Sequence, residues 1–107
     1  METEHSIFLE HVGDSPRMRL IQFLIEGRDF DYTLTDMLKA NISWGTLNTL
    51  IAKLAEIGIV VPVRKVGNAT LYKINNKNKT AQQLIVIYDS LILEEFDKKS
   101  SEIKITV

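Results

Sequence analysis

Apolar side chains recur at helical spacing along much of the chain, in stretches that carry their own start and stop signals. The first clear stretch opens at Ser15-Pro16 and ends at Gly27, with apolar positions three and four residues apart between them. Serine caps a helix by accepting a backbone N–H hydrogen bond, and proline fits the first helical position. The pattern therefore predicts a helix between these signals. Residues 1–12 mix acidic and apolar side chains and are compatible with a short helix before it.

Two shorter helices are predicted next, joined by a tight turn at Asn41. Thr33 or Thr35 can cap the first of them, and asparagine tolerates the left-handed backbone that such a turn requires. Met37, Leu38 and Ala40 are expected to face inward. The second helix opens at Ser43 and carries one continuous apolar stripe. The stripe consists of Leu47, Leu50, Ile51, Leu54 and Ile57, and Gly58 ends it.

After Gly58 the helical period gives way to runs rich in β-branched residues. Ile59–Val66 and Ala69–Ile74 flank the dipeptide Gly67-Asn68, which suits the primed turns that close tight hairpins. Pro62 cannot donate a backbone hydrogen bond, which places the first of these strands at a sheet edge. Asp31–Thr33 can form a further, very short strand.

The last predicted helix runs from Thr80 to about Lys99 and is apolar around a wide part of its circumference. It could merely cover its own domain, but its excess apolar width favours a symmetric homodimer. The expected dimer interface consists of Ile7, Phe8, Leu84, Ile87, Tyr88, Leu91, Ile92 and Phe96. The alternating tail Ile103–Val107 is compatible with a strand or with disorder.

Composition narrows the class of protein. The chain has 107 residues, an apolar share of 45% and no cysteine, which indicates one domain without disulfides or thiolate metal sites. Its start lacks the features of a secretion signal, and its longest apolar cluster is too short to span a bilayer. We therefore expect a soluble, cytoplasmic protein with no membrane contact.

Positive charge is concentrated in residues 33–79, although the whole chain is close to neutral. That segment contains seven basic and two acidic side chains, whereas the formal net charge of the chain is −1. A basic excess on paired helices and a hairpin indicates a surface that binds a polyanion.

The order helix, short strand, helix, helix, hairpin, long helix resembles the winged helix-turn-helix fold. More closely, it resembles the small transcriptional regulators of the ArsR/MarR-like group common in archaea. The resemblance runs from Gly13 to about Ile74. The stretches that carry it are Gly13-Asp14-Ser15-Pro16, Asp29-Phe30-Asp31-Tyr32-Thr33-Leu34-Thr35, Leu50-Ile51-Ala52-Lys53-Leu54 followed by Gly58-Ile59-Val60, and Leu71-Tyr72-Lys73-Ile74. The chain departs from the family pattern at Asn41, where glycine is usual in a turn one residue longer, and at the bulky Trp44.

The resemblance implies an α+β, mostly helical fold class: a winged helix-turn-helix with a C-terminal dimerisation helix. Residues 1–79 would form the DNA-binding part, with a short N-terminal segment. Residues 80–107 would add the dimerisation helix and tail to the same compact domain. In this fold the third helix, about residues 44–57 here, enters the major groove of double-stranded DNA, and the hairpin 59–74 lies on the backbone or minor groove.

With the leucine-lined stripe turned inward, the outer face of the third helix is predicted to contact DNA. The predicted contacts are Ser43, Trp44, Thr46, Asn48, Thr49 and Lys53 on this helix, and Arg64, Lys65, Asn68 and Lys73 on the hairpin. The alternatives are an ordinary solvated helix face and charges that only keep an edge strand soluble. Trp44 either packs over the helix start or stacks on the DNA backbone.

Two functions fit this pattern. The leading hypothesis is a sequence-specific regulator that binds double-stranded DNA as a homodimer. The alternative is a winged-helix module that binds protein within a transcription or chromosome-maintenance complex, because the reading face is only weakly basic and lacks arginine. His5 and His11 are the only histidines, and no nucleophile, carboxylate-pair or phosphate-loop motif is present. We therefore expect no catalytic activity, metal or cofactor, and nothing in the sequence points to a small-molecule effector.

Overall fold

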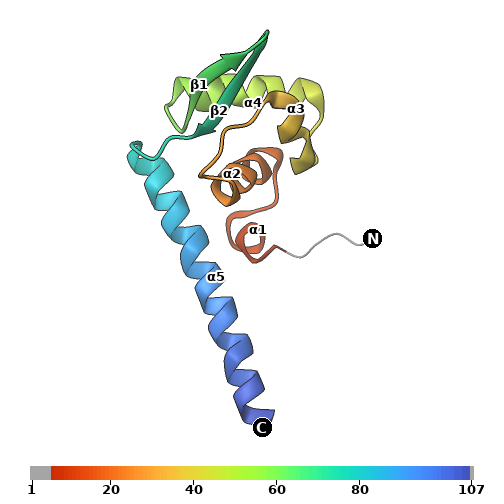
Figure 1. Ribbon diagram of the computed structural model, residues 1–107. Helices are drawn as coiled ribbons and strands as arrows, with labels where there is room; N and C mark the ends of the chain where they lie inside the picture. The colour runs from red at the N-terminus through yellow and green to blue at the C-terminus, as the bar shows by residue number, and fades with distance from the viewer. Residues whose placement is uncertain (1–5, 107) are drawn as a thin grey trace.

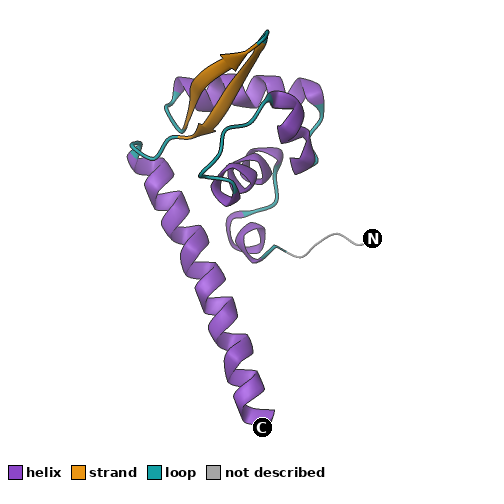
Figure 2. Cartoon of the chain, in the orientation of Figure 1, coloured by secondary structure: helices purple, strands orange, loops and turns teal. Residues whose placement is uncertain are grey.

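The computed structural model describes residues 6–106, with side chains described as far as Lys99; His5 and Val107 lie outside the described residues. The elements follow the predicted order (Figure 1). They are α1 (Ile7–Val12), α2 (Pro16–Glu26), α3 (Leu34–Met37), the 3-10 helix η1 (Leu38–Ala40), α4 (Trp44–Glu56), β1 (Val60–Val66), β2 (Ala69–Ile74) and α5 (Lys79–Thr106). The two strands form one antiparallel hairpin beside α4, and helices make up the rest of the domain (Figure 2).

Local capping explains where the helices begin. Ser15 accepts a hydrogen bond from the backbone N–H of Met18 at the start of α2, and Ser43 caps α4 in the same way. Thr33, not Thr35, caps α3 and forms a reciprocal capping box with Asp36. These hydrogen bonds lie within one turn of the chain, and the sequence therefore indicates them directly.

The hydrophobic core lies between α2 and α4 and is closed by the hairpin and the first turn of α5. Its fully or almost fully buried side chains include Leu20, Ile21, Leu24, Ile25, Met37, Leu47, Ile51, Leu54, Val60, Ile74 and Ala81. Each large side chain of this kind stabilises the fold by roughly 1.5–3 kcal/mol relative to an exposed one. The inner stripe of α4 is thereby confirmed at its centre.

The predicted inward position of Leu38 is wrong, and the last residue of the apolar stripe on α4 is exposed. Leu38 is exposed, because α3 ends after one turn and the chain continues as η1, which changes the direction of the following side chains. Ile57 is exposed as well, because α4 ends at Glu56 and Ile57 is its C-cap. The apolar stripe of α4 is therefore shorter than its sequence pattern suggests.

The hairpin follows the predicted boundaries closely. β1 and β2 pair in antiparallel register from Val60 opposite Ile74 to Val66 opposite Ala69, with an irregularity between Pro62 and Arg64. A bulge of this kind places one extra residue in a strand and increases its local twist. Gly67 has a φ of 63°, as a primed turn with glycine in the first central position requires.

The predicted short strand exists as a single bridge. Tyr32 and Tyr72 each donate a backbone hydrogen bond of 2.8 Å to the other, in antiparallel orientation. The ring of Tyr32 also packs edge-on against Phe23 of α2, with centroids 5.0 Å apart. This bridge therefore attaches β2 to the helical body.

The final helix is longer than predicted. α5 has 28 residues and includes positions 103–106, which corrects the expectation of a strand or disorder in the tail. In Figure 1 it passes beside α1 and then extends away from the rest of the domain. The Arg28 guanidinium donates two hydrogen bonds of 3.1 and 2.8 Å to the Asp89 carboxylate and so fixes α5 to the end of α2.

Part of the surface predicted to meet a second chain is occupied within this one. Phe8 is fully buried, and its ring packs edge-on against Tyr88 with centroids 5.6 Å apart. Leu84 and Tyr88 pack partly buried against the core of their own chain. Their own domain thus covers Phe8 completely and Leu84 and Tyr88 in part, and the assignment of these residues to a dimer interface stays a prediction. Between Lys79 and Lys99, where the side chains of α5 are described, the large apolar residues that stay exposed are Val86, Ile87, Ile92, Leu93 and Phe96.

Candidate nucleic-acid interface

The outer face of α4 is exposed to solvent. Ser43, Trp44, Thr46, Asn48, Thr49 and Lys53 are all exposed, as the sequence predicts for a reading face. On the opposite side of the same helix, Leu47 and Leu54 are completely buried. The helix thus presents its polar side outward along its N-terminal half, which is the part that meets base edges in helix-turn-helix proteins.

The polar groups of this face are held along the helix by local hydrogen bonds. The Asn48 amide donates to the carbonyl of Trp44 at 2.9 Å, and the Thr49 hydroxyl donates to the carbonyl of Gly45 at 3.2 Å. The Ser43 hydroxyl donates to that of Thr46 at 3.0 Å. These bonds use only part of each group's capacity, since an amide has a second N–H and an acceptor oxygen, and a hydroxyl has acceptor lone pairs. The remaining capacity is open to a ligand.

Trp44 and Lys53 stand out on this face. Trp44 is 53% exposed at the first position of α4, so a large part of its ring surface faces solvent. Lys53 lies 3.7 Å from the Glu56 carboxylate, and both side chains are exposed, so this ion pair contributes little to stability. The face therefore combines one large aromatic ring, several small polar groups and one weakly paired cation.

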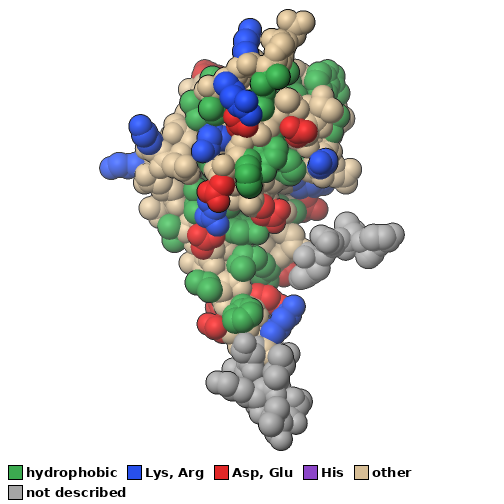
Figure 3. All heavy atoms as spheres, viewed as in Figure 1, with side chains coloured by type: hydrophobic (Ala, Val, Ile, Leu, Met, Phe, Trp, Pro, Cys, Tyr) green, Lys and Arg blue, Asp and Glu red, His purple; other side chains and the backbone are tan. Residues whose placement is uncertain are grey.

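The hairpin carries the remaining predicted contacts. Lys65 and Asn68 are exposed near its tip, and Lys73 is half-buried on β2. Arg64 is arranged differently, because its guanidinium donates two hydrogen bonds of 2.7 and 3.1 Å to the Asp31 carboxylate. The hydrogen bond from Arg64 holds the pKa of Asp31 below its usual value, with a smaller charge contribution from Lys73. On the face drawn in Figure 3, Lys and Arg side chains are scattered over the upper part with Asp and Glu side chains among them, and apolar side chains continue down the narrower lower part.

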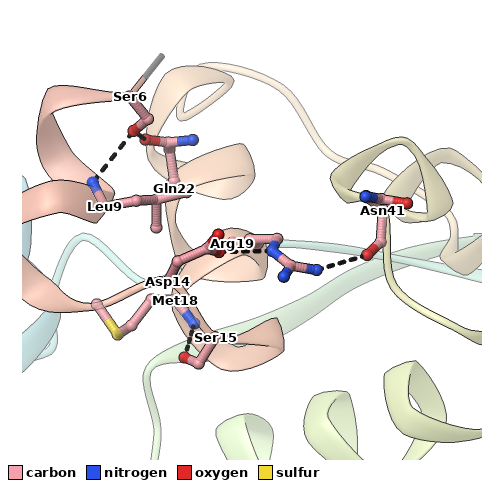
Figure 4. A network of polar contacts seen from close by, with 8 residues as sticks. All are labelled: Ser6, Leu9, Asp14, Ser15, Met18, Arg19, Gln22 and Asn41. Atoms are coloured by element: carbon pink, nitrogen blue, oxygen red, sulfur yellow. Dashed lines mark hydrogen bonds and ion pairs between the residues drawn. The ribbon is translucent and has the colours of Figure 1, made fainter. Parts of the chain in front are cut away.

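A polar network fixes the turn that leads into α4 (Figure 4). Asn41 has φ 64° and ψ 54°, the left-handed conformation predicted from its type. The Arg19 side chain donates to the backbone carbonyl of Asn41 at 2.9 Å and to the Asp14 carboxylate at 2.7 Å. Arg19 thereby connects the loop before α2 to the turn before α4. A single arginine on a helix carries no sequence signal for such a contact, and sequence reasoning missed it.

A cleft of about 650 Å³ lies between α1, α2, η1 and α5 and was also not predicted. Apolar side chains such as Phe8, Phe23 and Ile92 line it together with the charged Arg19 and Glu26. Among the described residues, no group of three or more His, Cys, Asp and Glu side chains converges as a metal site would require. None of the helices in residues 6–106 combines the length and the apolar content needed to cross a membrane.

Comparison with known proteins identifies similar solved structures. Rv0081 of M. tuberculosis has a TM-score of 0.56 at 19% identity, over 87% of this chain and 89% of that one. The heme sensor protein PefR, solved with heme and carbon monoxide, has a TM-score of 0.57 at 14% identity, over 92% of this chain and 74% of that one. PefR from Streptococcus agalactiae in complex with heme has a TM-score of 0.56, with the same identity and coverage.

No family model and no curated protein matches the sequence. The likeness to these solved structures therefore concerns the fold, since the identities are below 20%. The element order, the capped α4 behind a left-handed turn and the antiparallel hairpin after it agree with that likeness. The chain has a winged helix-turn-helix fold, extended by a long C-terminal helix.

Proposed function

We propose that this protein is a transcriptional regulator that binds double-stranded DNA in a sequence-specific manner as a homodimer. In this proposal α4 lies in the major groove. The wing, defined here as the β1–β2 hairpin Val60–Ile74, lies along the backbone or minor groove. The observation that carries the proposal is the uncovered polar face of α4, whose opposite side is fixed in the core.

The proposed contacts fall into two classes. Asn48 and the neighbouring threonines of α4 are proposed to face base edges, where an asparagine amide can pair with adenine. Lys53, Lys65 and Lys73 are proposed to neutralise phosphates, which supplies affinity without sequence information. With few cations and no arginine on the reading face, a modest sequence preference supported by DNA shape is expected.

A salt titration tests DNA binding directly. Affinity for a mixed-sequence duplex of about 30 base pairs should fall steeply with salt, by roughly 0.9 in logarithmic slope for each phosphate contacted. Lys65→Ala and Lys73→Ala should each reduce that slope by about one unit. Lys98→Ala is the matched control, because it removes the same charge from the distant part of α5. A salt-independent affinity, or equal effects of all three variants, would refute the proposed interface.

Trp44 provides a second test, of whether a duplex binds at the start of α4. It is the only tryptophan of the chain and lies at the start of α4, so its fluorescence reports on this end of the reading face alone. A duplex that binds as proposed should change the emission with the same midpoint as the salt-sensitive binding. Selection of randomised duplexes should then show that Asn48→Ala relaxes preference at one base position, by about 1–3 kcal/mol.

Dimerisation is proposed through the apolar side chains that α5 leaves exposed. Two copies joined there would present two α4 helices to half-sites about 34–36 Å apart. Phe96 is 65% exposed on α5 and Phe30 is 66% exposed elsewhere, which makes them a matched pair. Sedimentation of the full chain should show that Phe96→Glu weakens self-association and Phe30→Glu does not. A wild-type protein that is monomeric at high concentration would exclude the dimer.

The exposed Trp44 favours one alternative, a winged-helix module that binds protein. Large exposed aromatic side chains are enriched at the centres of protein interfaces, and the only cation of the reading face is partly neutralised by Glu56. In that case Trp44 emission would not respond to any duplex, and the salt titration would show no binding. The two experiments above therefore separate the two functions.

A further inference from the structure

The outer half of the wing has no buried side chain to hold it. All residues from Pro62 to Asn68 are exposed, whereas Val60 and Ile74 at the base of the hairpin are buried in the core. A two-stranded ribbon is marginally stable alone, so its direction depends on the contacts at its base and on any link further out. The position of the wing tip therefore needs an additional contact.

Arg64 supplies that contact. Within the described chain, its two hydrogen bonds to Asp31 are the only side-chain hydrogen bonds that join residues 62–68 to the rest of the domain. The planar guanidinium and carboxylate meet side by side, which fixes orientation as well as distance. The side chain of Asp31 is only 17% exposed, so it is a firmly placed partner for the more exposed arginine.

Asp31 is in turn attached to the helical body. The next residue, Tyr32, exchanges two backbone hydrogen bonds with Tyr72 of β2 and packs its ring against Phe23 of α2. The connection therefore runs from α2 through Tyr32 and Asp31 to Arg64 on the outer half of β1. Arg64 and Asp31 are 33 residues apart in sequence, and the fold brings them together.

We propose that Asp31 and Arg64 form a wing clamp, a bidentate pair that sets the direction of the outer hairpin relative to the reading helix. Arg64 is then a positioning residue, and Lys65 and Lys73 make the phosphate contacts of the wing. The effect of the clamp on DNA affinity rests on the proposed DNA-binding function, but the clamp itself is a property of the free protein. The clamp and a simple electrostatic role predict opposite effects of removing the Asp31 charge. Loss of a negative charge near DNA would by itself strengthen binding, whereas loss of the clamp should weaken it.

Asp31→Asn tests the clamp, with Asp29→Asn as the matched control. Both variants remove one negative charge from the same loop, and Asp29 makes no hydrogen bond or ion pair with another described side chain. In the free protein, exchange of the Val66 amide, which faces Ala69 across the hairpin, should become about threefold faster in Asp31→Asn. It should stay unchanged in Asp29→Asn. Equal exchange in both variants would overturn the clamp whether or not the protein binds DNA.

DNA binding gives the second readout. Asp31→Asn should weaken duplex affinity about threefold, whereas Asp29→Asn should leave it unchanged or slightly stronger. Arg64→Lys keeps the positive charge but cannot make the two parallel hydrogen bonds of a guanidinium to Asp31. It should weaken duplex affinity about as much as Asp31→Asn does, without reducing the dependence of affinity on salt. Stronger binding by Asp31→Asn, or full affinity in Arg64→Lys, would instead make Arg64 a direct phosphate contact. Absence of all DNA binding would refute the proposed function, while the exchange experiment would still decide the clamp.

Discussion

The turn at Asn41, just before α4, offers a direct test of how a left-handed backbone conformation affects the stability of this fold. Asn41 is the only described residue other than glycine with a positive φ, at 64°. Its side chain is exposed and makes no hydrogen bond with the rest of the described chain, whereas its backbone carbonyl accepts from Arg19. Substitution of the side chain therefore changes the backbone preference and little else.

The left-handed conformation costs an ordinary L-residue roughly 1–2 kcal/mol, and asparagine and glycine pay less. Asn41→Ala should therefore lower the free energy of unfolding by about 1 kcal/mol. Asn41→Gly should keep the free energy of unfolding within about 0.5 kcal/mol of wild type. Glycine adopts the left-handed conformation at lower cost, but it also raises the entropy of the unfolded chain, and the two effects oppose each other. For a domain of this size, 1 kcal/mol corresponds to about 4–8 °C in Tm.

Urea unfolding followed by circular dichroism measures both variants. Asn76→Ala and Asn76→Gly are the controls, since Asn76 is also exposed in a loop but has no positive φ. At that position alanine should be at least as stable as glycine, which reverses the order expected at Asn41. If alanine and glycine rank the same way at both positions, the strain assigned to the turn is not there.

Other predictions follow from packing and titration. Leu47→Ala should lower the free energy of unfolding by about 2–5 kcal/mol in the same assay, because Leu47 is completely buried. An added Cβ at Gly27 would lie 2.0 Å from the Tyr32 hydroxyl, whereas one at Gly45 meets nothing within 4 Å. Gly27→Ala should therefore destabilise by about 1–3 kcal/mol, and Gly45→Ala within α4 should stabilise by about 0.5–1 kcal/mol. Burial, with a smaller effect of its hydrogen bond to a carboxylate, raises the pKa of Tyr88 from 10.0 to about 12. Since the unfolded chain loses this proton first, unfolding free energy should fall between pH 10 and 12, and Tyr88→Phe should reduce that fall.

Features that depend on neighbouring residues in sequence could be predicted well. The caps at Ser15 and Ser43, the left-handed Asn41 and the tight turn at Gly67 each involve hydrogen bonds or backbone angles within a few residues. The fold class followed from their order, and the structure confirms it. The short helix η1 was not predicted, because the direction of the chain after α3 is set by packing on α2 and not by local propensity.

Features that join distant segments could not be predicted. Nothing in the spacing of Arg19, or of Asp31 and Arg64, reveals a contact across 22 or 33 residues. The wide apolar surface of α5 was recognised, but sequence alone could not show that Tyr88 packs partly buried against the core of its own chain while Leu93 stays exposed. That division depends on where α1 and α2 lie against the helix.

The attachment of α5 at Asp89 has a geometric consequence. Seventeen residues follow Asp89 up to the end of α5 at Thr106, and at about 1.5 Å per residue they extend roughly 25 Å beyond this pivot. A tilt of about 10° there moves the far end by roughly 4 Å. In a dimer joined through that part, loosening the pivot by Asp89→Asn would broaden the range of half-site separations that two copies tolerate. Duplexes that differ only in the number of base pairs between half-sites would measure this tolerance.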